Sequence, residues 1–552
     1  MSSLPSPRRS ACRRLGAVTA RLGVVAALLV ATPVASSAQR SVPAPHAASA
    51  QRPARPRRVA PPSLGIFQGT TDVGRSSTFG PGAARYDPRA RTYEVTGGGA
   101  NMWGAADHFR YLWLKVSGDV AIEASVRFTD SQPDSGEAQP HRKACLVIRQ
   151  SLDSSAVYAD AALHADGLTS LQWRDTPGAP THEVQSAVSG PARLRIEKRG
   201  EYMSMYVADG AEPLRPSGGA AKLALGPTFY VGLGVTAHDS TRIETATFSD
   251  VRVERLAPVS DTGAVISTIE TINLRSKDRR VAAVVQERVP VASVWWYPDG
   301  SRTLYFRAAI DQLVRIQADL PGQAPSRGRM AGPQRVALGI TACDHCTTPD
   351  TGRRWTLRDD APHSSPGLFL TLVEATSAAF RAGDAGTVPG LLARWSADGS
   401  AYVFASVKDD QIYLARARSR EPIRLTSSGH NADPVLSPDG RVVYFTSDRS
   451  GRPQLWRMNA DGSAPERLTR DDADNTHPYP SPDGRSLAFL TFDGPARSRA
   501  PLRDARLRLL SLADGRIEEL AKMLAGSFSL AAYPWSPDGQ YLAFVSYQRA
   551  PR

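Results

Sequence analysis

One short turn sequence recurs five times in the second half of the chain. The copies end at Gly300, Gly399, Gly440, Gly484 and Gly539, and their usual form is Ser-Pro-Asp-Gly. Proline presets φ, aspartate hydrogen-bonds back to the turn amides, and glycine accepts the positive φ that closes a hairpin. The glycines are 99, 41, 44 and 55 residues apart. A period of about 40–45 residues is typical of the four-stranded blade of a β-propeller.

The residues between these turns account for four strands per repeat. A β-rich run follows each turn, and a second turn, such as Asn459-Ala460-Asp461-Gly462, precedes an outer strand. The 99-residue interval corresponds to two blades, one of which lacks the turn. The last repeat has two strands, and strands expected at 264–275 and 281–286 supply the other two. We therefore predict a six-bladed propeller over 262–552, closed by strands from both ends.

The first half of the chain alternates apolar and polar residues. In 120–128, for example, Val120, Ile122, Ala124, Val126 and Phe128 point one way and the residues between them point the other. This period of two predicts half-buried strands. About ten such runs occur between 65 and 256, separated by turn clusters and without an amphipathic helix. The predicted fold class is thus all-β, with a two-sheet jelly-roll sandwich at 65–256.

The N-terminal residues are typical of an export signal. Arginines 8, 9, 13 and 14 precede the apolar run Leu22 to Val34, and small residues at 36–38 fit a cleavage site. The apolar run is too short to span a bilayer, so we expect no transmembrane anchor after cleavage. Residues 1–38 are predicted to be a signal peptide and 39–64 an Ala/Pro/Arg-rich disordered linker. The mature protein is expected outside the cytoplasm, in the periplasm or beyond, and the export route stays open between the general and twin-arginine systems.

The net charge of +13 does not indicate nucleic-acid binding. Ten arginines and no acidic residue lie in residues 1–60, which leaves +3 on the other 492 residues. A body so close to neutral offers no electrostatic reason to bind DNA or RNA.

Four cysteines do not form a disulfide framework. Cys12 leaves with the predicted signal, and Cys145 lies in an apolar run where a buried thiol is expected. Cys343 and Cys346 have the spacing of half a zinc site, but the chain has no second such pair. We predict a small loop disulfide between them, with a free thiol pair as the alternative.

The repeat at 437–469 resembles the six-bladed propeller of TolB-like proteins, and the segments around Ser481 and Ser536 repeat it. Residues 99–254 resemble a concanavalin A-like, laminin-G-like jelly roll. The segments that carry this resemblance are Asn101-Met102-Trp103, 141–143, 158–174 and 230–239. The resemblance implies a TolB-like protein of the kind labelled a biopolymer transport component, which is an argument from fold. It departs from TolB in having no small α/β domain before residue 262. The surface that TolB offers to outer-membrane lipoproteins therefore cannot be assigned by residue.

The sequence bears on three classes of enzyme. No G-x-S-x-G nucleophile elbow occurs in the sequence, and no E-x-D-x-x-E pattern of a jelly-roll glycosidase occurs in 65–256. Some propellers of this type are metal-dependent lyases of pectin fragments. His430 and His477 each precede an expected inner strand and are the candidate metal ligands here. Further candidates are Asp433, Asp474, His345 and His363. The competing explanation is that these residues bond to turn amides of the next blade. The sequence favours a protein without catalytic residues and without a cofactor.

The jelly roll carries the candidate ligand site. Sugar recognition needs an aromatic plane and a few fixed donors and acceptors. The candidates are His141, Arg142, Lys143, Tyr158, Asp160, His164, Asp166 and Trp173, with Arg174 beside them. Tyr158, Asp160 and His164 are expected to share one face of a strand, which is a binding site or a solvated face. Trp173 is a stacking residue or part of the core.

These observations predict an exported binding or scaffold protein. The jelly roll is expected to bind glycan or protein, and the propeller to bind partner proteins in the cell envelope. The alternative is a carbohydrate-active enzyme, a lyase or hydrolase, with a metal site in the propeller tunnel.

Overall fold

Every named element of the described residues is a β-strand. The structure is a computed structural model that describes residues 63–549 except 76–77, 79, 130–138, 191, 218, 258–264, 288–290, 292–293, 297–302, 310–311, 318–333, 338–354, 360–369, 375–389, 397–399, 407, 417–420, 495–501, 527–528 and 531–533. These residues all belong to the unit Pro61–Arg552. The part of the chain that the structure describes contains no helical segment with the length and hydrophobicity of a membrane span.

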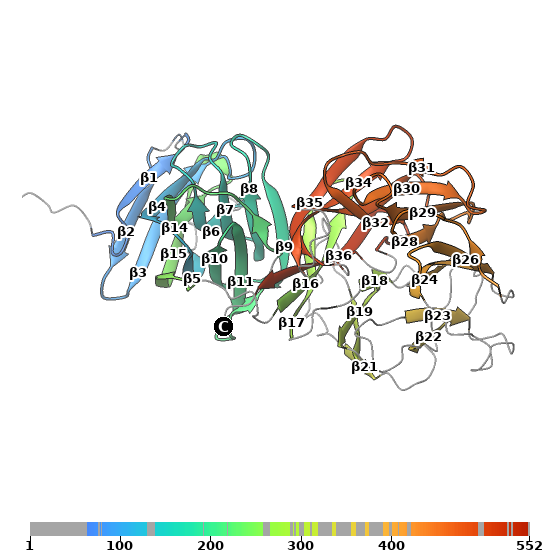
Figure 1. Cartoon of the computed structure of the whole chain (residues 1–552). Coiled ribbons are helices and arrows are strands. Elements are labelled where there is room, and N and C mark those ends of the chain that lie inside the picture. The colour runs from blue at the N-terminus through green and yellow to red at the C-terminus, as the bar shows by residue number, and fades with distance from the viewer. Residues whose placement is uncertain are drawn as a thin grey trace, which may run out of the picture. The chain divides into compact units, whose positions relative to one another are not determined.

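The N-terminal half consists of two antiparallel sheets (Figure 1). The first has the order β1 (Gly69–Val73), β4 (Phe109–Val116), β14 (Phe229–Thr236), β6 (Lys143–Arg149), β7 (Tyr158–His164), β8 (Leu168–Arg174) and β9 (His182–Ser189). The second has the order β12 (Arg215–Pro216), β11 (Tyr202–Asp209), β10 (Ala192–Arg199), β5 (Val120–Phe128), β15 (Asp239–Arg255), β3 (Thr92–Gly99) and β2 (Ala83–Asp87), and β13 (Ala221–Lys222) pairs with β11.

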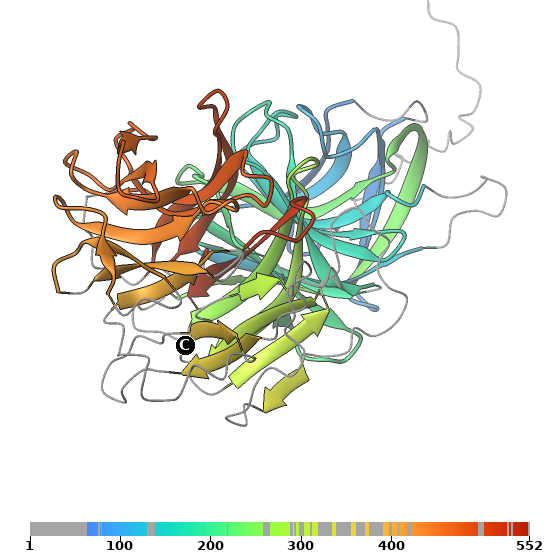
Figure 2. The ribbon, with the colours of Figure 1, turned by 90° about the vertical axis from the view of Figure 1, so that its right-hand side faces the viewer.

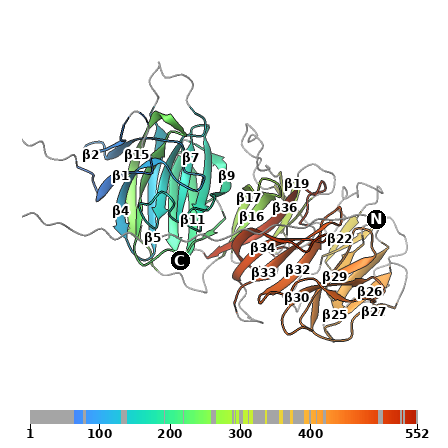
Figure 3. The same ribbon diagram turned by 90° about the horizontal axis from the view of Figure 1, so that it is seen from above.

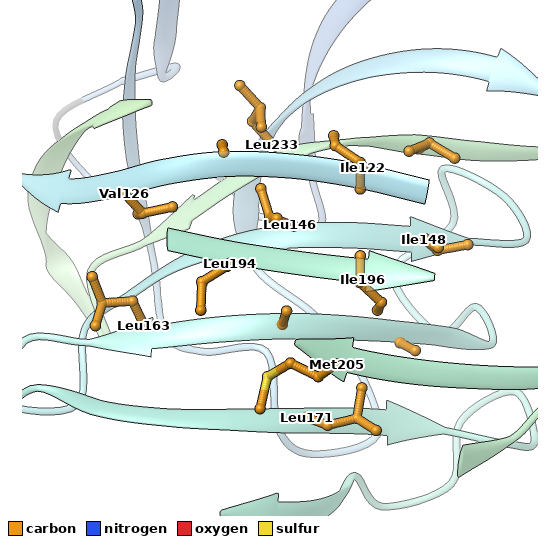
Figure 4. Packing of buried hydrophobic residues seen from close by; sticks show 14 of the residues in the cluster. Ile122, Val126, Leu146, Ile148, Leu163, Leu171, Leu194, Ile196, Met205 and Leu233 are labelled. Carbon is orange, nitrogen blue, oxygen red and sulfur yellow. The ribbon is translucent and has the colours of Figure 1, made fainter. Parts of the chain in front are cut away.

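The inner faces of these two sheets form one apolar core. Ile122 and Ile196 of the second sheet pack with Leu146, Ile148 and neighbouring residues of the first, and the labelled side chains fill the space between the strands (Figure 4). The residues between them on β5, such as Glu123, point away from this core. The alternation predicted from the sequence is therefore the pattern that buries one face of each strand. Burial of these aliphatic side chains contributes about 1.5–3 kcal/mol each.

The C-terminal half contains a series of short antiparallel sheets (Figure 2). The first consists of β18 (Val294–Trp296), β19 (Thr303–Ala309), β20 (Gln312–Gln317) and β21 (Gln334–Ala337), and the second of β22 (Trp355–Asp359) and β23 (Leu370–Glu374). The third consists of β24 (Gly390–Trp395), β25 (Ala401–Ser406), β26 (Ile412–Arg416) and β27 (Ile423–Arg424), and the fourth of β28 (Asn431–Leu436), β29 (Val442–Ser447), β30 (Gln454–Asn459) and β31 (Glu466–Arg467). Four further strands, β32 (Asp474–Pro480), β33 (Ser486–Phe492), β34 (Arg503–Ser511) and β35 (Ile517–Ala525), also pair in chain order and belong to the long sheet that contains β9. Where four strands are described, they follow one another in chain order, as in propeller blades.

The remaining strands join distant parts of the chain. β36 (Tyr541–Arg549) pairs along its whole length with β16 (Val265–Asn273), which pairs in turn with β17 (Arg279–Glu287). This is the pairing that the two-stranded last repeat leads us to expect. A short parallel pairing of Arg279 and Arg280 with β9 continues the sheet. Figure 3 shows β1–β15 in blue to green and the later strands, ending in red, from above.

The recurring turn has the same hydrogen bonds in each complete copy. The hydroxyl of Ser481 donates to Asp483 over 2.5 Å and accepts from the amide of Ser486 over 3.0 Å, and Gly484 has φ +69°. Ser437 and Ser536 make the same pairs of bonds. The serine thus closes the hairpin from inside the turn, a role that the sequence motif did not reveal.

We expect Ser481→Ala to lower the free energy of unfolding by about 1 kcal/mol, because the hydroxyl's hydrogen bonds to Asp483 and to the partly buried amide of Ser486 are lost. Urea denaturation measures this loss. The exposed Ser117→Ala is the control and is expected to change stability by less than about 0.5 kcal/mol. An equal effect of both variants would contradict the structural role of the turn serine.

The all-β class and the propeller are confirmed. The number of six blades and the concanavalin A-like identity of the sandwich stay predictions.

Candidate functional site

The outer face of the first sheet, which points away from the sandwich core, has an apolar part and a polar part. Phe109, Tyr111, Val147, Cys145 and neighbouring side chains form a small apolar cluster over β4, β14 and β6. Beside it, over β6 to β9, lies a set of polar side chains that are almost fully buried: Lys143, Arg149, Tyr158, Asp160, His164, Ser170, Gln172, Arg174 and Glu183. We call this set the polar face. Burying a charged group costs free energy unless the group is paired, so each charged residue of the polar face needs a hydrogen-bond or ion-pair partner.

Asp107 neutralises two arginines at one end of the polar face. Its carboxylate lies 2.7 Å from Arg174 and 3.3 Å from Arg149, and all three side chains are fully buried. The Arg174 guanidinium also lies 5.0 Å from the centre of the Tyr158 ring. Asp107 therefore holds both guanidinium groups in place, and both are buried away from solvent.

Lys143 lies at the centre of the polar face. Its ammonium donates to the carbonyl of Met102 over 3.1 Å and to Gln172 over 2.9 Å. It also lies 5.0 Å from the centre of the Trp103 ring. Burial lowers the pKa of Lys143, against the opposing field of Asp160. Gln172 in turn donates to Glu183 over 2.9 Å, so this amide links the cation and the anion.

Asp160 is the exceptional residue of the polar face. It is fully buried, and neither of its carboxylate oxygens has a hydrogen-bond partner among the described residues. The groups that act on it are the Lys143 ammonium, more distant acids and the neighbouring Cys145 thiol. Burial raises the pKa of Asp160 to about 8, with Lys143 acting in the opposite direction. The carboxyl group is therefore mostly protonated at neutral pH.

A short segment covers this part of the sheet. The carbonyl of Met102 accepts from Lys143 and from the Tyr158 hydroxyl, and the carbonyl of Trp103 accepts from the amide of Thr181 over 2.9 Å. The side chain of Trp103 itself is 37% exposed, although most large apolar residues of the described chain are buried. An indole ring held over a buried ammonium and open to solvent is the kind of surface on which a sugar ring stacks.

Three histidines meet at the other end of the polar face. The rings of His141 and His164 are 6.2 Å apart, and those of His141 and His238 are 5.6 Å apart. Nε2 of His164 lies 3.2 Å from the amide nitrogen of Gln172 and 3.9 Å from a carboxylate oxygen of Glu183, and the buried Nδ1 of His164 has no hydrogen-bond partner among the described residues. Burial and, after it, the charge of Lys143 lower the pKa of His164 and of His238. We call these three residues the imidazole cluster.

The structure brings together five of the eight predicted ligand-binding residues. His141, Lys143, Tyr158, Asp160 and His164 lie on the polar face or at its end.

The other three lie elsewhere. Trp173 is buried in the sandwich core, with His182 stacked on it, so it does not present a stacking surface. Arg142 points to the opposite side of β6, where it pairs with Glu244. Asp166 caps the turn before β8 by accepting from the amide of Leu168 over 3.0 Å.

Sequence reasoning missed Trp103, Gln172, Glu183 and His238. Gln172 and Glu183 follow from the register, because Gln172 lies opposite Asp160 and Glu183 lies opposite Gln172. Strand alternation applied to β8 and β9 was the signal that would have found them. Trp103 lies in a loop, and no periodic pattern indicates which way a loop side chain points.

The two propeller histidines have different partners. His430 is exposed and lies 3.0 Å from Asp410, whereas His477 lies 3.6 Å from Asp433. Asp474 pairs with Arg452 and Arg503. Within the described residues, no group of three or more His, Cys, Asp or Glu side chains is arranged to hold a metal ion. Cys343, Cys346, His345 and His363 lie outside the described residues, and Cys145 is a free, buried thiol whose pKa is raised by burial.

The comparisons with known proteins concern the propeller. The model of the TolB β-propeller domain matches residues 385–520. The uncharacterized protein Atu1656 of Agrobacterium fabrum is 30% identical over 291 residues, which are 52% of this chain and 94% of that protein. The Tol-Pal system protein TolB of Bordetella pertussis is 43% identical over 54 residues, 9% of this chain and 12% of TolB. Among solved structures, a putative TolB from Agrobacterium tumefaciens is 28% identical, with 52% of this chain and all of that chain covered and a TM-score of 0.42.

The chain belongs to the family of TolB-like β-propeller proteins. This conclusion rests on the match to Atu1656 along nearly its whole length and on the propeller-domain model.

Proposed function

We propose that the protein is an exported scaffold of the cell envelope, in which the propeller binds partner proteins and the sandwich binds a glycan. Membership of the TolB-like family supports an envelope protein that binds other proteins. The predicted signal peptide at 1–38 supports export. A propeller gathers its connecting loops on two rims, which suits the binding of partners.

One observation carries the glycan proposal: the exposed Trp103 ring lies over the polar face, where buried polar atoms lack partners. A folded protein rarely leaves such atoms unpaired, unless a water or ligand completes their hydrogen bonds. Sugars offer both an apolar ring face and hydroxyl groups. The polar face therefore matches a glycan better than it matches an apolar ligand.

An oligosaccharide array tests this proposal. We expect saturable binding by the full chain and binding at least about tenfold weaker by Trp103→Ala, because the stacking surface is lost. Ile243→Ala is the matched control, since Ile243 is an exposed apolar residue of the other sheet. Equal binding by Trp103→Ala would place the glycan on another face. No binding to any oligosaccharide would leave only the protein-binding scaffold.

A second candidate function is a carbohydrate-active enzyme with its site in the propeller. The observation that favours it is a chain of three side chains, in which Thr476 lies 2.8 Å from Nδ1 of His477 and Nε2 of His477 lies 3.6 Å from Asp433. His477 has a φ of +57° and Asp433 a φ of +52°, and each of them precedes a proline. Strained backbone conformations of this kind cluster at functional sites. The amide of His477 also bonds to Asp433, which is the structural role considered above.

Metal analysis of the purified protein, together with an oligosaccharide cleavage screen, separates the two functions. A stoichiometric divalent ion and uronide cleavage that is lost in His477→Gln would establish the enzyme. Their joint absence would contradict it.

A further inference from the structure

The imidazole cluster lies where three strands of the first sheet end side by side. Thr236 of β14 lies opposite Lys143 of β6, and Lys143 lies opposite His164 of β7. His238 follows β14 by two residues and His141 precedes Lys143 by two residues, and their rings lie 5.6 Å apart. His238 has φ +57°, a left-handed conformation that a histidine adopts at a cost of about 1–3 kcal/mol.

The cluster contains a buried polar atom that the described residues leave unsatisfied. Nδ1 of His164 has no hydrogen-bond partner among them. His141 is exposed and His238 is half-buried, so these two outer rings are open to a ligand, and the ring of His141 lies 6.2 Å from that of the buried His164. A group with two acceptor oxygens can accept from both outer imidazoles, whereas the oxygen of a single hydroxyl serves one of them.

The charges around the cluster favour an anion once the outer imidazoles are protonated. Lys143 has neutral acceptors, Met102 and Gln172, as its hydrogen-bond partners and, within the described residues, no carboxylate within ion-pair distance. Glu244 pairs with Arg142, and Asp239 pairs with Arg242 and accepts from Thr241. Glu183 accepts from the neutral amides of Gln172 and Gln185 and lies 3.9 Å from Nε2 of His164, so its charge offsets that of Lys143. Each proton that His141 or His238 takes up therefore leaves a net positive charge for an anion to offset.

We propose that the imidazole cluster binds a carboxylate group of an acidic glycan and takes up protons as it does so. This inference rests on the proposed glycan binding and names its ligand class. An anion beside His141 and His238 stabilises their protonated forms, so binding adds protons at pH 7 and strengthens as the pH falls from about 8 to 6.

Calorimetric titration of the full chain tests the inference with three probes: β-1,4-linked tetraglucuronate, cellotetraose, which has the same linkage without the carboxylates, and inorganic phosphate. Titration in buffers of different ionisation enthalpy measures the protons taken up. We expect tetraglucuronate to bind at least about tenfold more tightly than cellotetraose, with proton uptake. The double variant His141→Gln/His238→Gln is expected to lose this preference and the uptake, and to bind cellotetraose as before. His182→Gln, a histidine stacked on Trp173, is the matched control.

The possible failures can be told apart. Equal affinity for the two sugars without proton uptake would overturn the inference and leave glycan binding intact. Binding of phosphate but not of tetraglucuronate would overturn the assignment to a glycan. Binding of neither sugar would overturn the inference, and the oligosaccharide array would then decide separately whether the sandwich binds glycans at all.

Discussion

Replacing Asp107 with alanine is expected to lower the free energy of unfolding by about 3–5 kcal/mol. Asp107, Arg149 and Arg174 are fully buried, and the carboxylate is the anion that both guanidinium groups share. Asp107→Ala leaves two buried cations without that anion. Their desolvation is then no longer offset by attraction, which is the most costly change that a single substitution makes on the polar face. Urea denaturation followed by tryptophan fluorescence measures the loss.

A double-mutant cycle and a surface control make this prediction specific. Asp107→Ala should cost less in the background of Arg174→Met, because one of the two unpaired cations is then absent. Glu94→Ala removes the partner of the exposed Arg85 and is expected to cost less than about 1 kcal/mol. A loss of under about 1 kcal/mol in Asp107→Ala itself would show that the arginines find water or other partners, and that the polar face is less closed than the structure indicates.

Asp160→Asn is expected to stabilise the protein at pH 9 and to have little effect at pH 5. The pKa of Asp160 is about 8 in the folded protein and near 3.8 in the unfolded chain. Between about pH 4 and 8 the folded state therefore holds a proton that the unfolded state has released. Stability from this group falls as the pH rises through that window, and above about pH 8 the folded protein contains a buried carboxylate. The amide of asparagine does not ionise and removes this cost.

The size of the effect is several degrees in melting temperature, since a free energy of a few kcal/mol shifts the melting temperature by about 2–4 °C per kcal/mol in a domain of this size. Thermal denaturation of both proteins at several pH values measures it. Asp160→Asn also removes the field with which Asp160 raises the pKa of Lys143, so the trend reports on this pair of residues. Glu94→Gln makes the same chemical change at an exposed carboxylate and is expected to show no such trend. A difference between Asp160→Asn and the unmodified protein that does not change with pH would mean that Asp160 is solvated or paired.

The propeller could be predicted because its signal is local. Ser481, Asp483 and Gly484 bond to each other and to the next strand, so the four-residue motif contains the whole hairpin turn. The core of the sandwich could be predicted for a related reason. Alternation along β5 directs Ile122, Ala124 and Val126 to one side, whatever strand lies beside it.

The same alternation could not tell a binding face from a solvated one. It placed Tyr158, Asp160 and His164 together, but all three are buried, because a segment from another part of the chain covers them. That segment, Met102 to Gly104, is more than 50 residues away in sequence from Tyr158. Contacts at such a distance follow from how the sheets fold and not from the order of residues in a strand.

The two tryptophans show the division most clearly. By itself the sequence determined the all-β class, the propeller repeat and the alternating faces, because turn chemistry and strand period act over a few residues. Only the tertiary structure decided that Trp173 lies in the core and that Trp103 lies open over Lys143. Exposure, burial and the pKa of Asp160 depend on which distant segment packs over each residue, and that packing is a property of the whole fold.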